Sequence, residues 1–166
     1  LPGNVCLPLS ATFNDLTTIN EANQVLTYVW DFGDATTSTD KNPVHNYTGT
    51  GPFTTKLTVT SNNGCFDDSV KIVNTVYAKA KADFNVTAEL CLNDSTRYTD
   101  ASDPKGSAIS QWKWTFGDGG VAAVQNPVHR FLTPNTFITA LYIVTDKGCY
   151  SDTITKSTVV NPLPTS

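Results

Sequence analysis

The sequence contains three short motifs that each occur twice, in the same order and at the same spacing. Residues 30–34 (Trp-Asp-Phe-Gly-Asp) are followed 84 positions later by residues 114–118 (Trp-Thr-Phe-Gly-Asp). The same spacing relates the two copies of Asn-Pro-Val-His, which begin at Asn42 and Asn126, and the two copies of a Gly-Cys pair. A constant period over most of the length indicates two tandem copies of one structural unit.

The repeat predicts a division into two domains, residues 1–77 and residues 78–166. Near the start of each copy the spacing is 85 positions, as between Cys6 and Cys91, so the second copy is one residue shorter before its Trp motif. The segment between the copies, residues 76–82, has no Gly, Pro or Ser. Such a segment favours a short, stiff connection over a flexible linker.

Both copies have the residue pattern of β-structure. Apolar and polar residues alternate from Phe53 to Thr60, which is typical of a half-buried strand, and no segment has a sustained helical period. Gly33 and Asp34 supply the backbone freedom and the side-chain acceptor that a tight turn needs. Several short strands with closely spaced turns predict an all-β chain, with one sandwich of two sheets in each copy.

Four cysteines occupy matching places in the two copies. Only a pairing within each copy treats both copies alike, so we expect bridges between Cys6 and Cys65 and between Cys91 and Cys149. In the chain-entropy model each bridge would stabilise its copy by about 4 kcal/mol. The alternatives are four reduced thiols in a cytosolic protein and, less favoured without a Cys-x-x-Cys motif, a zinc site.

The charge and hydropathy of the chain limit its partners. The formal net charge is −4 and the isoelectric point is near 4.9, which argues against nucleic acid. No apolar run approaches the length that spans a membrane, so membrane insertion is not expected. Disulfides favour an oxidising compartment, and a chain that begins with Leu1 is expected to be an excerpt of a longer exported protein.

Three motifs in fixed order resemble those of the polycystic kidney disease (PKD) repeat. That family combines Trp-Asp-Phe-Gly-Asp-Gly, Asn-Pro-x-His-x-Tyr and a Tyr/Phe-x-Val-x-Leu-x-Val strand, and the resemblance covers essentially the whole chain. Departures occur at Ala35, Thr115 and Phe131 and concern local turn geometry. The matching structural residues are Trp30, Phe32, Gly33, Asp34, His45, Trp114, Phe116, Gly117, Asp118 and His129.

The resemblance implies two immunoglobulin-like sandwiches of about seven strands each. The cysteines resemble those of a disulfide-containing type found in secreted or surface proteins of Bacteroidetes-like bacteria, which implies an extracellular or cell-surface location. Residues 82–87 look like the family's first strand, whereas almost nothing precedes Cys6 in the first copy. We therefore expect the first sandwich to lack its first strand, and residues 160–164 to begin a link to a further repeat.

The repeated His and Asp residues raise the question of catalysis. His45 and His129 could serve as general bases or metal ligands, and Asp34 and Asp118 as acids. The alternative is that each imidazole and each Gly-Asp turn is structural, and we favour it because no hydrolase motif such as Gly-x-Ser-x-Gly is present. The chain is therefore not expected to be an enzyme.

One acidic loop is a candidate calcium site, although no cofactor is otherwise expected. Asp100 and Asp103 lie in a segment that resembles a loop near which some PKD repeats bind calcium. Carboxylate oxygens are suitable ligands for that ion. The alternative is a solvated acidic loop, and Lys105 stands where a further carboxylate could be.

A second candidate surface lies on the alternating strand of the second copy. Ile138, Ala140, Tyr142 and Val144 are expected to point outward, where the first copy has Thr and Lys. An apolar outward face suggests a contact surface for a glycan, for a partner protein or for the neighbouring copy. Ile138 and Tyr142 are the binding candidates.

The leading functional hypothesis is a non-catalytic extracellular spacer or interaction module of a larger protein. Its expected partners are neighbouring domains of the same polypeptide and other surface proteins or glycans. The alternative is an accessory carbohydrate-binding module of a secreted polysaccharide-degrading enzyme.

Overall fold

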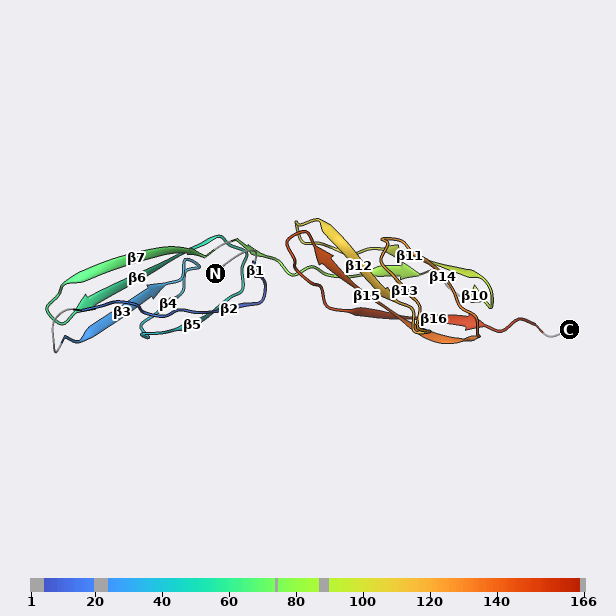
Figure 1. Ribbon diagram of the computed structural model, residues 1–166, viewed down its shortest axis with the longest axis horizontal. Helices are drawn as coiled ribbons and strands as arrows, with labels where there is room; N and C mark the ends of the chain where they lie inside the picture. The colour runs from blue at the N-terminus through green and yellow to red at the C-terminus, as the bar shows by residue number, and fades with distance from the viewer. Residues whose placement is uncertain (1–4, 20–23, 74, 87–89, 165–166) are drawn as a thin grey trace. The chain divides into compact units, whose positions relative to one another are not determined.

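The computed structural model describes residues 5–19, 24–73, 75–86 and 90–164. The chain divides into two compact units, Leu1–Ala78 (unit 1) and Lys79–Ser166 (unit 2), which differ by one residue from the predicted division. The described residues form strands and turns and no helix (Figure 1), which confirms the prediction of an all-β chain. In the part of the chain that is described, no helix is long and apolar enough to cross a membrane.

Unit 1 contains two facing sets of strands, with a short parallel pair at its end. One sheet has the order β4-β3-β6-β7, and β2 pairs with β5 in the other. The parallel pair joins β1 to β8. The strands are β1 Val5–Cys6, β2 Leu9–Thr12, β3 Leu26–Asp31, β4 Thr37–Ser38, β5 Val44–Tyr47, β6 Phe53–Ser61, β7 Phe66–Val73 and β8 Val76–Tyr77.

Unit 2 repeats this arrangement, with β16 in the place of β7 and β8 and with an additional strand that has no counterpart among the described strands of unit 1. Its sheets have the orders β10-β16-β15-β12-β13 and β14-β11-β9. The additional strand is β9, which pairs antiparallel with β11. The strands are β9 Phe84–Val86, β10 Leu90–Cys91, β11 Ser95–Asp100, β12 Ile109–Thr115, β13 Val121–Ala122, β14 Val128–Arg130, β15 Asn135–Thr145 and β16 Ile154–Asn161.

The alternating residues of the two long strands fill the cores. On β6, Phe53, Leu57 and Val59 are buried together with the hydroxyl-bearing Thr55, and the residues between them face outward or lie half-buried. The same alternation holds on β15 until Ile143. The expectation that Val144 points outward is wrong, since it is 7% exposed where the chain forms a β-bridge with Tyr150.

The two units differ at the edge where their first strand belongs. In unit 2, β11 lies between β14 and β9. In unit 1 the equivalent strand β2 has β5 as its one neighbour among the described residues. Among the described residues of unit 1, no strand takes the place of β9; residues 1–4 lie outside the described ranges, so the expected lack of a first strand in this sandwich stays a prediction.

Candidate functional site

Each unit fastens its Gly-Asp turn to a neighbouring strand through an Asp–His pair. In unit 1, His45 Nε2 lies 2.7 Å from Asp34 Oδ2. The imidazole stacks on Phe32 with ring centroids 4.1 Å apart and an angle of 2° between the planes. Tyr47 meets the imidazole edge-on at 4.5 Å. The side chain of His45 is thus held on three sides.

Unit 2 has the same arrangement. His129 Nε2 lies 2.8 Å from Asp118 Oδ2, and the ring stacks on Phe116 at 4.1 Å. Burial of the Asp118 carboxyl acts to raise its pKa, but the hydrogen bond from His129 and the one from the backbone of Gly120 outweigh burial and lower it. In unit 1, burial likewise acts to raise the pKa of Asp34, and hydrogen bonds from Thr36 and His45 lower it. The imidazole and the carboxylate in each unit hold a turn in place.

Glycine is required in both turns for two separate reasons. Gly33 has φ 78° and Gly117 has φ 82°, a backbone conformation that other residues rarely adopt. A Cβ atom on Gly33 would also lie 2.5 Å from the Thr54 carbonyl oxygen, and one on Gly117 would lie 2.7 Å from that of Ile138. The turn can therefore pack directly against the central strand of the sheet only without a side chain.

The two tryptophans of the repeated motif are anchored inside their own units. Trp30 Nε1 donates to the Asp40 carbonyl oxygen at 3.0 Å, and Trp114 Nε1 donates to that of Val124 at 2.9 Å. Both rings are buried. Each tryptophan thus connects its sheet to the loop that precedes Asn-Pro-Val-His. This connection explains why Asn-Pro-Val-His follows the Trp motif at the same spacing in both units.

The calcium candidates Asp100 and Asp103 are engaged by protein donors. Asp100 Oδ2 accepts from Trp112 Nε1 at 2.9 Å, and its Oδ1 accepts from the Ser102 backbone at 3.1 Å. Asp103 pairs with Lys105 at 2.6 Å. Within the described ranges, no group of three or more His, Cys, Asp or Glu side chains is placed to hold a metal ion. Calcium binding at this loop stays a prediction.

The binding candidates on β15 form a partly exposed surface. Ile138 is 53% exposed and Tyr142 is half-buried. The Tyr142 ring lies 6.3 Å from the ring of Tyr150, at an angle of 32° between the planes. Sequence reasoning did not include Tyr150, because it follows the Gly-Cys pair beyond the alternating strand.

The cysteines contradict the predicted pairing. Cys6 and Cys149 are disulfide-bonded, whereas Cys65 and Cys91 are free and exposed. The prediction of one bridge within each copy, Cys6 with Cys65 and Cys91 with Cys149, is therefore wrong.

The physical reason is that the two cysteines of a unit lie at opposite ends of it. Cys65 is in the turn that leads into β7, and Cys6 is beside Tyr77, beyond the far end of that strand. The eight residues of β7 span about 26 Å at ~3.3 Å per residue, whereas a disulfide needs Cα atoms within about 7 Å. In unit 2, β16 likewise separates the turn of Cys149 from Cys91, which pairs with Asn161.

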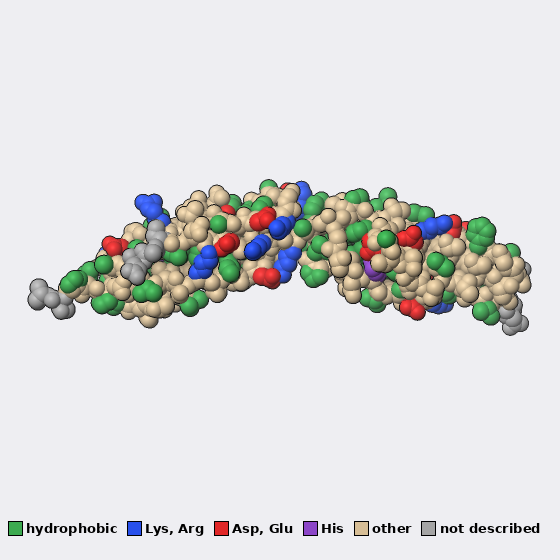
Figure 2. Space-filling model, turned by 180° about the vertical axis from the view of Figure 1, so that it is seen from behind, with side chains coloured by type: hydrophobic (Ala, Val, Ile, Leu, Met, Phe, Trp, Pro, Cys, Tyr) green, Lys and Arg blue, Asp and Glu red, His purple; other side chains and the backbone are tan. Residues whose placement is uncertain are grey.

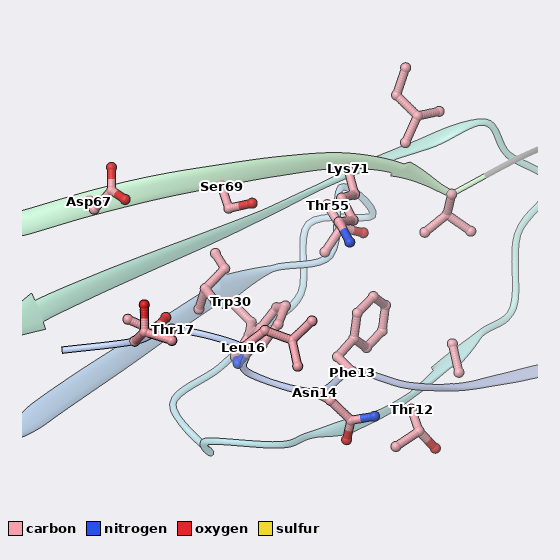
Figure 3. A pocket seen from close by; sticks show the side chains of 15 residues that line it. Thr12, Phe13, Asn14, Leu16, Thr17, Trp30, Thr55, Asp67, Ser69 and Lys71 are labelled. Atoms are coloured by element: carbon pink, nitrogen blue, oxygen red, sulfur yellow. The ribbon is translucent and has the colours of Figure 1, made fainter. Parts of the chain in front are cut away.

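A cavity of about 550 Å³ opens in unit 1 beside β2. Figure 3 shows Phe13, Leu16 and Trp30 between the segment that follows β2 and strands β6 and β7, with Lys71 at the rim. Sequence reasoning missed this cavity and Lys71. The signal lay in the repeat, because β2 corresponds to β11 and, among the described residues of unit 1, no strand pairs with β2 as β9 pairs with β11 in unit 2.

Charged side chains of both signs lie near one another on the surface. Figure 2 shows this mixing on one face of the chain. Lys56 pairs with Asp68 at 2.7 Å and Lys156 pairs with Asp83 at 2.7 Å. Several charged side chains are thus neutralised by a close partner, under a small net negative charge.

These two sandwiches, each with the same Gly turn and the same Asp–His fastening, define a tandem pair of immunoglobulin-like modules. The chain belongs to the PKD domain family: the family model described as "PKD domain" matches residues 2–76 and again residues 78–160. That match confirms the resemblance seen in the three repeated motifs.

The curated relatives are much longer proteins. Collagenase ColA of Bacillus cereus is 47% identical over 47 residues, which is 28% of this chain and 5% of that protein. Collagenase ColA of Clostridium perfringens is 38% identical over 60 residues, which is 36% of this chain and 5% of that protein. Among solved structures, the PKD1 domain from the Vibrio cholerae metalloprotease PrtV is 22% identical, has a TM-score of 0.45, and covers 50% of this chain and 98% of that one.

Proposed function

We propose that this chain is a non-catalytic pair of modules that spaces and connects other domains of an exported bacterial protein. The observation that supports this most directly is how the repeated residues are used. His45, His129 and their Asp partners are stacked, paired and partly buried in the same way in both units. Residues repeated for a reaction would be expected to reach a shared open cleft, and these fasten turns.

The matches to relatives support an accessory role. The segment that this chain matches is 5% of the length of each of two proteins named as collagenases. Collagen is an extracellular protein, so an exported parent protein is consistent with these names. The disulfide-bonded state of Cys6 and Cys149 also favours an oxidising compartment.

The spacer role is tested by placing the 166-residue chain between two folded reporter domains and measuring the distribution of distances between them. We expect a narrower distribution than for a Gly/Ser linker of equal residue number, since such a linker behaves as a flexible coil. An equally broad distribution would contradict the proposal. Hydrolysis of a protein or polysaccharide substrate, lost in both H45Q and H129Q, would contradict the non-catalytic assignment.

A second candidate function is glycan binding at β15. The neighbouring rings of Tyr142 and Tyr150 favour it, because Tyr150 is 61% exposed and aromatic rings stack on sugar faces. A glycan array probed with the wild-type chain tests this, with Y142S and Y150S as variants. A signal lost in both variants supports a glycan site, and the absence of any signal leaves the spacer as the one function proposed.

A further inference from the structure

Each unit has cysteines of two kinds, and each kind occurs at equivalent positions in both units. The turn cysteines, Cys65 and Cys149, follow the tight turns after the long strands β6 and β15. The edge cysteines, Cys6 and Cys91, end the short strands β1 and β10. The chain therefore has two cysteines of each kind.

The two turn cysteines are held by the same backbone hydrogen bonds. Ser61 N donates to the Cys65 carbonyl oxygen at 2.8 Å, and Thr145 N donates to that of Cys149 at 3.0 Å. The glycine before each cysteine has a φ of 80° in unit 1 and 81° in unit 2, and its N–H donates back to the Ser or Thr carbonyl oxygen. The two turns therefore have matching backbones.

The two edge cysteines match as closely. Cys6 pairs with Tyr77 and Cys91 pairs with Asn161, each through two parallel strands. The N–H of the residue after each cysteine donates to the carbonyl oxygen of the same partner residue, at 2.9 Å in unit 1 and 2.8 Å in unit 2. The edge of unit 2 thus holds Cys91 as the edge of unit 1 holds Cys6.

The cysteines differ in oxidation state although their positions match. Cys6 and Cys149, one edge cysteine and one turn cysteine, are disulfide-bonded. Cys65 and Cys91, again one of each kind, are free and exposed. Each free thiol thus occupies a position whose equivalent in the other unit forms a disulfide.

A free thiol has to find its partner outside its own unit, because the turn cysteine and the edge cysteine of one unit lie at opposite ends of it, too far apart for a disulfide. The bonded edge cysteine belongs to unit 1, and the bonded turn cysteine belongs to unit 2. The same order along the sequence assigns Cys91 to a turn cysteine of a later repeat and Cys65 to an edge cysteine of an earlier repeat.

We propose that Cys65 and Cys91 are sites of disulfide bonding to further copies of this repeat in the same polypeptide. Cys91 bonds the turn cysteine of the repeat that follows unit 2, and Cys65 bonds the edge cysteine of the repeat that precedes unit 1. The two cysteines of each repeat thus serve two different bonds, one towards each neighbouring repeat.

Each bond forms by oxidation of two thiols by a disulfide reagent, such as oxidised glutathione. The thiolate of one cysteine attacks a sulfur of the reagent and displaces one of its thiols, and the second cysteine then attacks the mixed disulfide and displaces the other. Two electrons pass from the cysteine pair to the reagent, which leaves as two reduced thiols that carry the two cysteine protons. An oxidising compartment favours this reaction.

The test supplies a later repeat by joining two copies of the 166-residue chain in series through the linker Gly-Ser-Gly. In the inner fusion, C65S in the first copy and C91S in the second leave one candidate pair, Cys91 of the first copy and Cys65 of the second. These are 143 residues apart, as are Cys6 and Cys149 in the single chain. After incubation with oxidised glutathione, we expect peptide mass maps to contain this bond and the denatured protein to contain no free thiol.

The outer fusion is the matched control, with C91S in the first copy and C65S in the second. It keeps one exposed thiol of each kind, but the turn cysteine now precedes the edge cysteine along the chain. We expect both thiols to stay free in the monomeric protein. Two free thiols in the oxidised inner fusion would overturn the proposal, as would equal bond formation in the two fusions, which would indicate random collision of exposed thiols.

A mixture of the single-chain variants C65S and C91S distinguishes a repeat of the same polypeptide from a separate chain. The fusion holds its two thiols at a local concentration of about 1 mM, so at micromolar protein the bond should form about 100- to 1,000-fold faster within the inner fusion than between the separate variants. Equal rates in the fusion and in the mixture would make a separate chain the partner and would overturn the proposal.

Discussion

Unit 1 and unit 2 are two sandwiches with the same fold and the same turns. They differ in which residues pack against the tryptophan at one edge of the core. In unit 2 a first strand places Phe84 against Trp114. In unit 1 the equivalent Trp30 borders a cavity. The Asp–His pair and the Gly turn are nevertheless alike in both units, with His-to-Asp distances of 2.7 and 2.8 Å. The turn region is therefore independent of the first strand, and the strand contributes core packing and edge pairing.

A second difference concerns the tyrosine that supplies a buried hydroxyl group to the core of each unit. In unit 1, Tyr47 supplies a buried hydroxyl that lies 3.1 Å from Thr55 Oγ1. In unit 2, the residue at the Tyr47 position is Phe131, and the hydroxyl comes from Tyr98, 3.0 Å from Thr139 Oγ1. Each unit thus places one tyrosine hydroxyl against the same buried threonine, from a different strand.

The largest contrast expected is in thiol chemistry. Under non-reducing, denaturing conditions, an alkylating reagent should modify Cys65 and Cys91 completely and leave Cys6 and Cys149 unmodified, because only the first two are free. Peptide mass mapping checks this. Modification of all four cysteines, or of none, would contradict the cysteine states described above.

Removal of the Phe84 ring should bring unit 2 toward the condition of unit 1. F84A is expected to destabilise unit 2 by about 3–5 kcal/mol, the usual cost of truncating a buried Phe. Amide exchange of the full chain, resolved by unit, measures the effect. F66A is the matched control, since Phe66 is 72% exposed and its truncation should change stability by less than about 0.5 kcal/mol. Equal effects of the two variants would show that Phe84 is not a core residue.

The tyrosine exchange can be tested by moving the hydroxyl. Y47F should destabilise unit 1 by about 1 kcal/mol, because the buried Thr55 and the Phe32 carbonyl oxygen lose a partner. Adding F13Y should restore part of this loss by imitating Tyr98. Restoration is expected to be partial, since Tyr98 also contacts Thr158, and Val73 occupies that position in unit 1. Denaturant unfolding of Y47F and of the double variant F13Y/Y47F measures both changes. A double variant that is less stable than Y47F would contradict the exchange of the hydroxyl between the two positions.

The smallest expected effect concerns a turn residue. Ala35 has φ 70°, and the equivalent Gly119 has φ 93°. A35G should stabilise unit 1 by about 1 kcal/mol, because a left-handed conformation is unfavourable for a residue with a Cβ atom. G119A should destabilise unit 2 by a similar amount. Thermal unfolding of the two variants measures both changes, and a destabilising A35G would contradict this explanation of the turn.

The sequence was sufficient to predict the fold class and the two tandem units. Alternating strands and Gly-Asp turns are local features, and the period tied the Trp and Asn-Pro-Val-His motifs to one sandwich. The site residues were predicted less completely. The place of Lys71 at the rim of the cavity depends on cross-strand register, which the spacing of the motifs does not give. The cysteine pairing failed because symmetry between copies does not reveal at which end of a sandwich each cysteine lies.

The most direct test of this account is amide hydrogen exchange at the two equivalent edges, residues 13–18 of unit 1 and residues 98–103 of unit 2, measured in the same 166-residue chain. The edge in unit 2 should be protected, because the Ala101 and Asp103 amides donate to residues 83 and 81. The edge in unit 1 should exchange much faster, because among the described residues no strand pairs with it on the side away from β5. Equal protection of the two edges would contradict the claim that β9 pairs with the edge of unit 2 while no described strand pairs with the equivalent edge of unit 1.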